Sequence, residues 1–147
     1  MDGSPPHAPT RPGDVALARA LAWASRLQER AAGVGFDWPD ARGPLAKVHE
    51  ELGELAAALP PEGGDPPAAR AAVEDEIGDL LFAVVNLARK LGVDPRAALE
   101  RATAKFRRRF EELERLAAQR GMDVARASLD VLDRLWDEVK AGEGPGE

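Results

Sequence analysis

The sequence contains no cysteine among its 147 residues. Disulfides, zinc–thiolate sites and a cysteine nucleophile are therefore excluded, and the composition suits a reducing compartment. Long apolar runs are absent too, since the longest, Leu80 to Val85, is far too short to cross a bilayer. The first residues are polar and rich in proline, without the apolar centre of a signal peptide. We therefore expect a cytoplasmic protein with no membrane partner.

A surplus of basic residues is also missing, because 20 Lys and Arg stand against 26 Asp and Glu, a net charge of −6. An acidic protein of this size is a poor general binder of nucleic acid polymers, so we expect no such partner. Any anionic ligand must be bound by a local group of cations. The length and the 44% hydrophobic content suffice for one compact domain that buries roughly 70% of its unfolded surface.

Alternating β-branched runs are absent, and apolar residues recur with a period of 3.6, which predicts an all-α fold, a bundle of about five helices. Proline, glycine and capping residues place these helices from Asp14 to about Ala32 before Gly33, from Pro44 to Leu59, from about Pro67 to Leu91 before Gly92, from Asp94-Pro95 to near Gly121, and after Ser128. Residues 1–13 and 142–147 lack this periodicity. We expect a disordered arm, a folded domain over residues 14–141, and a disordered tail.

Apolar stripes on the predicted helices indicate which side chains form the core. The stripe of the second helix consists of Leu45, Val48, Leu52, Leu55 and Leu59, and that of the last helix of Leu129, Leu132, Trp136 and Val139. The third helix is apolar in nearly every direction from Ile77 onward, so we expect it to be buried all round.

Acidic residues cluster on the second and third helices. Glu51 and Glu54 share one side of the second helix, with Glu50 just beyond them, and alone they would be interpreted as a solvated acidic face. On the third helix Glu76 and Asp79 are again three residues apart, on a helix expected to be buried, where an unpaired carboxylate is costly. The short link rich in proline and glycine makes the two helices antiparallel neighbours, which brings both pairs together.

This arrangement predicts a metal site made of oxygen ligands. Glu51, Glu54, Glu76 and Asp79 offer carboxylates without cysteine, and no Glu-x-x-His pair occurs. Such a donor set suits a hard divalent cation, Mg²⁺ with Mn²⁺ as a substitute, and disfavours zinc, copper and a di-iron centre.

Basic residues gather on the fourth helix, where Lys105 and Arg109 are one turn apart and Arg101 and Arg108 lie near them. Such a group is by default a solvated basic face. The alternative is a phosphate clamp, in which an ammonium and a guanidinium hold the oxygens of a polyphosphate. In the last helix Trp136 lies on the apolar stripe, so packing is its ordinary role, and Lys140 is its neighbour one turn later.

Five segments together resemble a known family, the MazG-type nucleoside triphosphate pyrophosphohydrolases, an all-α group that includes the dimeric dUTPases. They are GVGFDWPD from Gly33, KVHEELGEL from Lys47, EDEIGDLLFAVVNLARKLG from Glu74, KFRRRFEELE from Lys105 and the closing LDRLWDEVK. The family's metal pattern, E-E-x-x-E followed by E-x-x-D, is met by Glu50, Glu51, Glu54, Glu76 and Asp79. Either half is a weak signal, whereas the combination with its flanks is specific.

The resemblance implies Mg²⁺-dependent hydrolysis of NTPs and dNTPs to the monophosphate and pyrophosphate, in nucleotide-pool house-cleaning, by a homodimer or higher homo-oligomer. By position it makes metal ligands of Glu51, Glu54, Glu76 and Asp79, while Glu50 lies behind them or orients the attacking water. Lys105 and Arg109 would stabilise the reacting phosphates. The further residues implied in substrate binding are Lys47, Asn86, Trp136, Lys140 and Trp38.

Two other classes of function stay open at this point. One is a helical scaffold or regulator that binds nucleotide or metal without hydrolysis, against which the intact metal positions argue. The other is a metal-storing or redox carboxylate bundle, which the lack of Glu-x-x-His pairs weakens.

Overall fold

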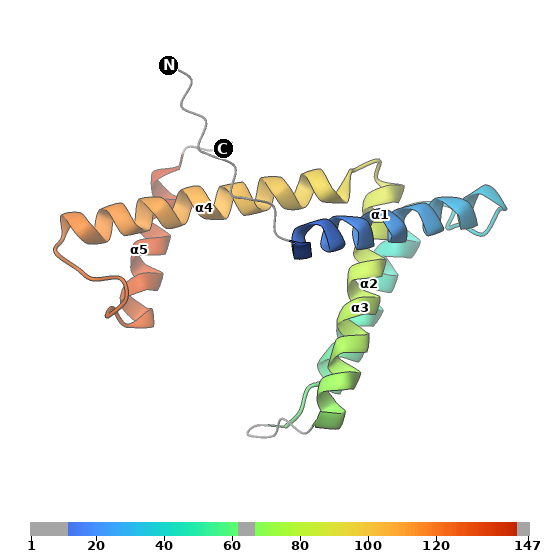
Figure 1. The fold of residues 1–147 in the computed structure, drawn as a ribbon, viewed down its shortest axis with the longest axis horizontal. Coiled ribbons are helices and arrows are strands. Elements are labelled where there is room, and N and C mark those ends of the chain that lie inside the picture. Colours follow the sequence, from blue (N-terminus) through green and yellow to red (C-terminus); the bar gives the residue numbers. More distant parts are fainter. Residues whose placement is uncertain (1–11, 62–66, 144–147) are drawn as a thin grey trace, which may run out of the picture. The chain divides into compact units, whose positions relative to one another are not determined.

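The computed structural model describes residues 12–61 and 67–143, and within these ranges it contains five helices and no strand (Figure 1). The predicted all-α class is confirmed. The chain divides into two compact units, Met1–Arg96 and Ala97–Glu147, which are described in turn. Most of the predicted arm, of the link between the second and third helices, and of the tail lies outside the described residues.

The first helix, α1 (Pro12–Gly33), begins two residues before the predicted Asp14 cap. Proline is well suited to a first helical position because its missing N–H has no acceptor there. The helix ends at Gly33 as predicted, but the residue in the left-handed conformation is Gly35, with φ of 86°. The N–H of Phe36 then bonds a carbonyl of the last turn at 3.0 Å, which closes the helix.

The second helix, α2 (Arg42–Ala58), begins two residues before the predicted Pro44 and ends one residue before Leu59. Pro44 is fully buried and occupies the first turn, where backbone N–H groups have no partner within the helix. The carboxylate of Asp40 accepts a hydrogen bond from the N–H of Arg42 at 2.9 Å and so satisfies one of these donors.

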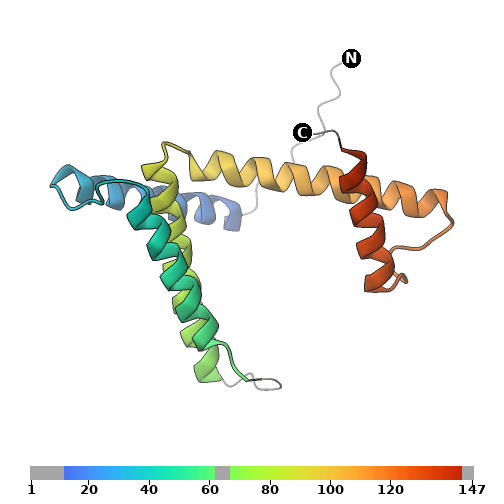
Figure 2. The ribbon, with the colours of Figure 1, turned by 180° about the vertical axis from the view of Figure 1, so that it is seen from behind.

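The third helix, α3 (Pro67–Lys90), has nearly the predicted bounds and is closed by Gly92, whose φ is 67°. The N–H of Val93 bonds the carbonyl of Ala88 at 2.8 Å, the pattern expected of a glycine closure. The helices α2 and α3 run side by side in opposite directions, as predicted, and α1 also packs on α3 (Figure 2).

The expectation that α3 is buried all round is wrong for a single chain. Ala83 and Val85 are its buried apolar residues, whereas Leu81 is 58% exposed and Ile77, Phe82 and Val84 are exposed as well. Within its unit α3 has only α1 and α2 to cover it, so part of its apolar surface faces solvent. Several members of the predicted α2 stripe are also exposed, namely Leu45, Leu52 and Leu59.

The second unit consists of most of α4 (Pro95–Gln119) and of α5 (Leu129–Gly142). Its core contains four buried side chains, Leu113, Ala117, Leu135 and Val139, with Leu132 and Trp136 packed against them. Leu129, predicted in the core, is 71% exposed, because the buried face of α5 centres on Leu135 and Val139. Ser128 occupies the predicted N-cap position, but its hydroxyl makes no capping bond.

The helix α4 has the predicted ends. Asp94 accepts a hydrogen bond from the N–H of Arg96 at 2.9 Å, and Gly121, with φ of 67°, follows the last turn. No helix within the described ranges is both long and apolar enough to cross a membrane.

Candidate metal and nucleotide site

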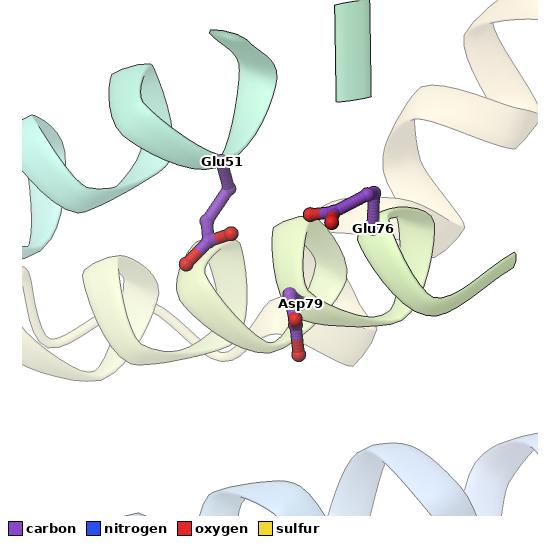
Figure 3. A group of neighbouring side chains, drawn as sticks. All are labelled: Glu51, Glu76 and Asp79. Atoms are coloured by element: carbon purple, nitrogen blue, oxygen red, sulfur yellow. The ribbon is translucent and has the colours of Figure 1, made fainter. Parts of the chain in front are cut away.

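Three carboxylates from the two antiparallel helices converge. The helix α2 presents Glu51 toward α3, which carries Glu76 and Asp79 three residues apart and thus on one face (Figure 3). One carboxylate oxygen of each residue lies within 4.8 Å of the other two. The adjacency of the helices and the spacing on α3 therefore bring together three of the four predicted ligands.

Two oxygens of this group are buried without a partner. Glu51 is only 5% exposed, and the structure gives neither its Oε2 nor Oε2 of Glu76 a hydrogen bond within the described ranges. A buried carboxylate oxygen is costly unless a donor or a cation compensates its lost hydration. The donor set is all oxygen, which suits a hard divalent cation such as Mg²⁺.

Lys47 forms ion pairs with two acidic residues of α2. Its Nζ lies 2.6 Å from Oε1 of Glu51 and 2.9 Å from Oε1 of Glu50. The hydrogen bond from Lys47 lowers the pKa of Glu51 and so keeps that buried carboxylate ionised. In this structure the ammonium that was predicted to bind substrate instead pairs with two acidic residues of α2.

Glu54, the fourth predicted ligand, is exposed and is not among the three converging carboxylates. Repulsion by Glu51, the largest cause, together with the nearby Glu76, raises the pKa of Glu54. The neighbouring carboxylates that raise this pKa are the same negative charges that attract a cation.

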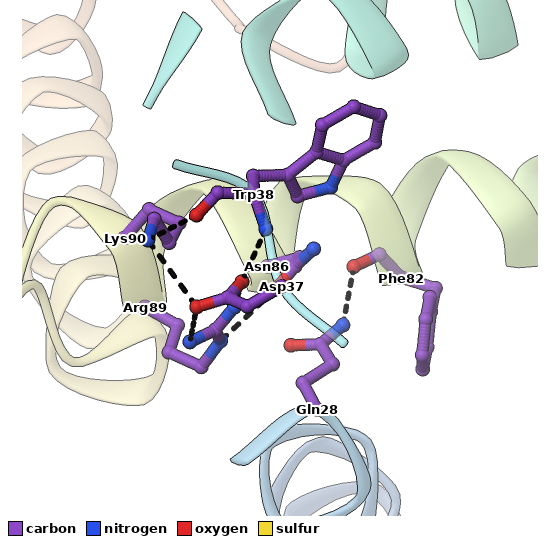
Figure 4. A network of polar contacts seen from close by, with 7 residues as sticks. All are labelled: Gln28, Asp37, Trp38, Phe82, Asn86, Arg89 and Lys90. Atoms are coloured by element: carbon purple, nitrogen blue, oxygen red, sulfur yellow. Dashed lines mark hydrogen bonds and ion pairs between the residues drawn. The ribbon is translucent and has the colours of Figure 1, made fainter. Parts of the chain in front are cut away.

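A second site is built around the loop that follows α1. Asp37 in this loop accepts hydrogen bonds from Nη1 of Arg89 and from Nζ of Lys90, both at 3.2 Å (Figure 4). Lys90 also donates to the carbonyl of Trp38 at 2.7 Å. These contacts fix the loop to the end of α3, and the hydrogen bond from Arg89 holds the pKa of Asp37 far below its usual range.

Between this loop, α1 and α3 lies an open pocket of about 440 Å³. It is lined by Leu27, Gln28, Ala31, Phe36, Asp37, Trp38, Phe82, Asn86 and Arg89. Trp38 and Asn86 were predicted to bind substrate, whereas Gln28, Phe82 and Arg89 were not. Phe82 and Arg89 fit the ordinary apolar and basic faces of a helix, and Gln28 is a single uncharged polar residue on α1, so no pattern in the sequence singles out any of the three.

Arg109, one of the two residues of the predicted phosphate clamp on α4, is paired with a carboxylate. Nε of Arg109 lies 2.9 Å from Oε1 of Glu143, and Nη2 lies 2.6 Å from Oε2, a two-pronged pairing that keeps the pKa of Glu143 low. Glu143 belongs to the predicted tail, residues 142–147, of which the structure describes Gly142, the last residue of α5, and Glu143. Lys105 lies with Arg101 and Arg108 along an open hollow of about 510 Å³.

Trp136 and Lys140, which were expected to bind substrate, contact other residues of their own unit. The ring of Trp136 packs against Phe106, with centroids 5.2 Å apart, and against the core of the second unit. Nζ of Lys140 lies 2.8 Å from a carboxylate oxygen of Asp137 on the same helix. Packing therefore accounts for Trp136 in this structure.

Residues 43–113 match the model of the MazG nucleotide pyrophosphohydrolase domain. The chain belongs to the MazG family. The matched range contains the acidic groups of α2 and α3 and also Lys105 and Arg109 on α4. The family resemblance that the motifs indicated is thus confirmed.

Two relatives are similar to this MazG chain over most of its length. A nucleoside triphosphate pyrophosphohydrolase/pyrophosphatase MazG from Thermotoga maritima is 42% identical over 127 residues, which cover 86% of this chain and 46% of that protein. A nucleoside triphosphate pyrophosphohydrolase from Escherichia coli K12 is 42% identical over 124 residues, covering 84% of this chain and 46% of that protein. The chain therefore spans about half the length of these relatives.

Proposed function

We propose that this MazG chain hydrolyses nucleoside triphosphates, NTPs or dNTPs, to the nucleoside monophosphate and pyrophosphate, with Mg²⁺ as the required ion. The observation that carries the proposal is the convergence of Glu51, Glu76 and Asp79 inside a MazG domain, with two buried oxygens that have no hydrogen-bond partner among the described residues. The activity named for the relatives from Thermotoga maritima and Escherichia coli supports the same reaction.

In this proposal Glu51, Glu76 and Asp79 hold the ion, and Glu54 joins them once a cation relieves its repulsion with Glu51. When bound, Mg²⁺ neutralises phosphate charge and activates water for attack. Lys47 keeps Glu51 ionised and in place by its 2.6 Å contact. Glu50, more than half exposed, orients the attacking water and takes up its proton.

The remaining proposed roles concern the substrate. Water attacks, and the phosphoanhydride bond between the α and β phosphates breaks, so that pyrophosphate leaves. The ammonium of Lys105 binds the triphosphate as a point charge, and the guanidinium of Arg109 binds it through two parallel hydrogen bonds. To do so, Arg109 releases the carboxylate of Glu143 and binds phosphate oxygens in its place. Trp38 and Asn86 contact the nucleoside, and Lys47, Trp136 and Lys140 complete the substrate site.

We also propose that the chain works as a homodimer or higher homo-oligomer in the cytoplasm, where it removes unwanted nucleotides from the pool. The exposed apolar residues of α3 support the assembly, because large apolar patches of this kind are ordinarily covered by a partner. The absence of cysteine agrees with a reducing compartment.

The test is pyrophosphate release from the eight common NTPs and dNTPs, each with Mg²⁺ and with EDTA. The proposal predicts release of pyrophosphate and monophosphate in equal amounts, only with the metal. A helical binding module would bind nucleotides without releasing pyrophosphate. A redox or storage bundle would take up iron and leave every nucleotide intact, and either result would overturn the proposal.

A further inference from the structure

Gln28 on α1 is a buried polar side chain with one half of its amide unsatisfied. It is 6% exposed, and its Nε2 donates a hydrogen bond to the carbonyl oxygen of Phe82 at 2.9 Å. Its Oε1 is buried and has no hydrogen-bond partner in the described part of the chain. The carbonyl of Phe82 can only accept, so this contact fixes the amide with nitrogen toward α3 and oxygen away from it (Figure 4).

Gln28 is one of the residues that line the 440 Å³ pocket, and the charged residues of that lining are paired with one another. Asp37 is bound by Arg89 and Lys90, so the lining carboxylate and guanidinium neutralise each other. Asn86 accepts a hydrogen bond from Nε of Arg89 at 3.0 Å through Oδ1, which leaves its NH₂ group as a donor. The pocket thus offers one fixed acceptor, on Gln28, and one fixed donor, on Asn86.

The rest of the lining is apolar, and three of its residues are aromatic. Phe36, Trp38 and Phe82 line the pocket together with Leu27 and Ala31. Aromatic faces of this kind favour stacking with a planar ring, and a buried acceptor without a partner favours a ligand that brings an N–H group. A heteroaromatic ring with a donor and an acceptor on one edge satisfies both conditions, and nucleobases have such edges.

We propose that this pocket binds the base of the nucleoside triphosphate and that Gln28 determines which base edges are accepted. Oε1 of Gln28 accepts a hydrogen bond from an N–H of the base, and the NH₂ group of Asn86 donates to a neighbouring acceptor atom. Adenine fits through its 6-amino group and N1, and cytosine through its 4-amino group and N3. The proposal rests on the proposed hydrolysis for its substrate class.

Removal of the donor from the base tests this assignment. ATP is compared with the triphosphate of purine riboside, which has the same ring system without the 6-amino group. A site built around an unpaired acceptor rejects a ligand that lacks the donor, so we expect kcat/KM to be roughly 10- to 100-fold higher for ATP. The variant Gln28→Met has a side chain of similar length without the amide, and it should reduce this ratio to about one.

Ser25→Ala on the same helix is the matched control and should keep the ratio of the unchanged protein. A purely structural Gln28, needed only for its bond to Phe82, would lower both rates in Gln28→Met and leave their ratio unchanged, and that result overturns the proposal. A ratio near one for the unchanged protein overturns it too, whether or not the variant folds.

The base preference can also be measured without catalysis. Calorimetry with the non-hydrolysable α,β-imido analogues of the same two nucleotides should give the same difference in Kd. If no triphosphate is hydrolysed but the analogues bind with this preference, the proposed hydrolysis is refuted and the assignment of the pocket to the base is supported. If hydrolysis occurs and neither kcat/KM nor Kd depends on the amino group, only the assignment of the pocket to the base is refuted.

Discussion

Glu51 is nearly fully buried, and the ammonium of Lys47 beside its Oε1 keeps the carboxylate ionised. Its other oxygen, Oε2, has no hydrogen-bond partner within the described ranges. Glu76 also has a buried oxygen without a hydrogen-bond partner in the part of the chain that the structure describes. Without a cation these carboxylates repel one another, and with one they become a single site. The residues of this group should therefore contribute to metal binding and oppose the stability of the metal-free chain.

Asp79→Asn tests this dual effect. Asp79 is exposed, so the substitution should leave the fold intact, abolish Mg²⁺-dependent hydrolysis, and leave the metal-free protein as stable as before or slightly more stable. Thermal unfolding with and without Mg²⁺ should show a rise in Tm for the unchanged protein and little rise for the variant. Asp75→Asn, an exposed neighbour outside the group, is the control. Equal turnover of the unchanged protein in EDTA and in Mg²⁺ would contradict the metal site.

Asp37 should make stability depend on pH in the acid range. Its pKa is far below the usual value in the folded chain and about 3.9 when unfolded, so its stabilising effect is full above that value. The effect is lost as the pH falls toward the folded pKa. Asp37→Asn should therefore be less stable than the unchanged protein at neutral pH, with a difference that shrinks on acidification. Urea unfolding at several pH values measures this, with Asp133→Asn as control, and a difference independent of pH would refute it.

At the scale of helices, most ends follow from local chemistry that the sequence displays. Gly92 and the Asp94-Pro95 pair predicted the end of α3 and the start of α4 correctly, because a left-handed residue and a capping carboxylate act within a few residues. The closure of α1 shows the limit of this reasoning. Gly33 and Gly35 are equally able to adopt positive φ, and which of them does so depends on where the following loop is anchored.

The parts of the candidate site that depend on the spacing of residues along one helix could be predicted from the sequence. Glu76 and Asp79 share a face by periodicity, and the short link predicted that α2 brings Glu51 to them. The pairing of Arg109 with Glu143 and the bond from Gln28 to Phe82 join residues far apart in sequence. Such contacts depend on how helices pack, which no period or motif encodes.

The helix α4 gives a prediction in which two interpretations differ in a measurable way. If Lys105 and Arg109 bind the triphosphate, replacing either with Ala should lower kcat/KM by roughly 30- to 1,000-fold, with metal binding unchanged. If they form a solvated face, the loss should stay within about threefold. Steady-state kinetics decides, with Arg101→Ala as the matched basic control that should cost little.

Glu143 refines this prediction because its carboxylate already occupies the fork of Arg109. A triphosphate that binds Arg109 must displace it, so Glu143→Gln should lower KM for the triphosphate while Arg109→Ala raises it. The paired variants measured under the same conditions test the exchange. An unchanged KM in Glu143→Gln would show that Arg109 and Glu143 form a structural pair only.

At the scale of the whole molecule, each of the two units, taken by itself, leaves large apolar side chains exposed. Exposed large apolar side chains occur on α1, α2, α3 and α4, including Trp23, Leu52, Leu81 and Phe106. The sequence correctly identified α3 as apolar nearly all round, but a hydrophobic pattern says which faces avoid water and not what covers them. A second copy of the chain would bury this surface and would account for the pattern that led to the expectation of a buried helix.

Light scattering at micromolar concentration should therefore give a mass of at least twice the 15.7 kDa of one chain. Leu81→Glu adds a charge to the exposed apolar side of α3, where it costs a single chain little and an apolar interface much, so it should shift the mass toward one chain. Val34→Glu adds the same charge in the loop after α1, at a residue 82% exposed, and should leave the mass unchanged. A mass of 15.7 kDa for the unchanged protein would refute the assembly, and the exposed side of α3 would then be an ordinary solvent-facing surface.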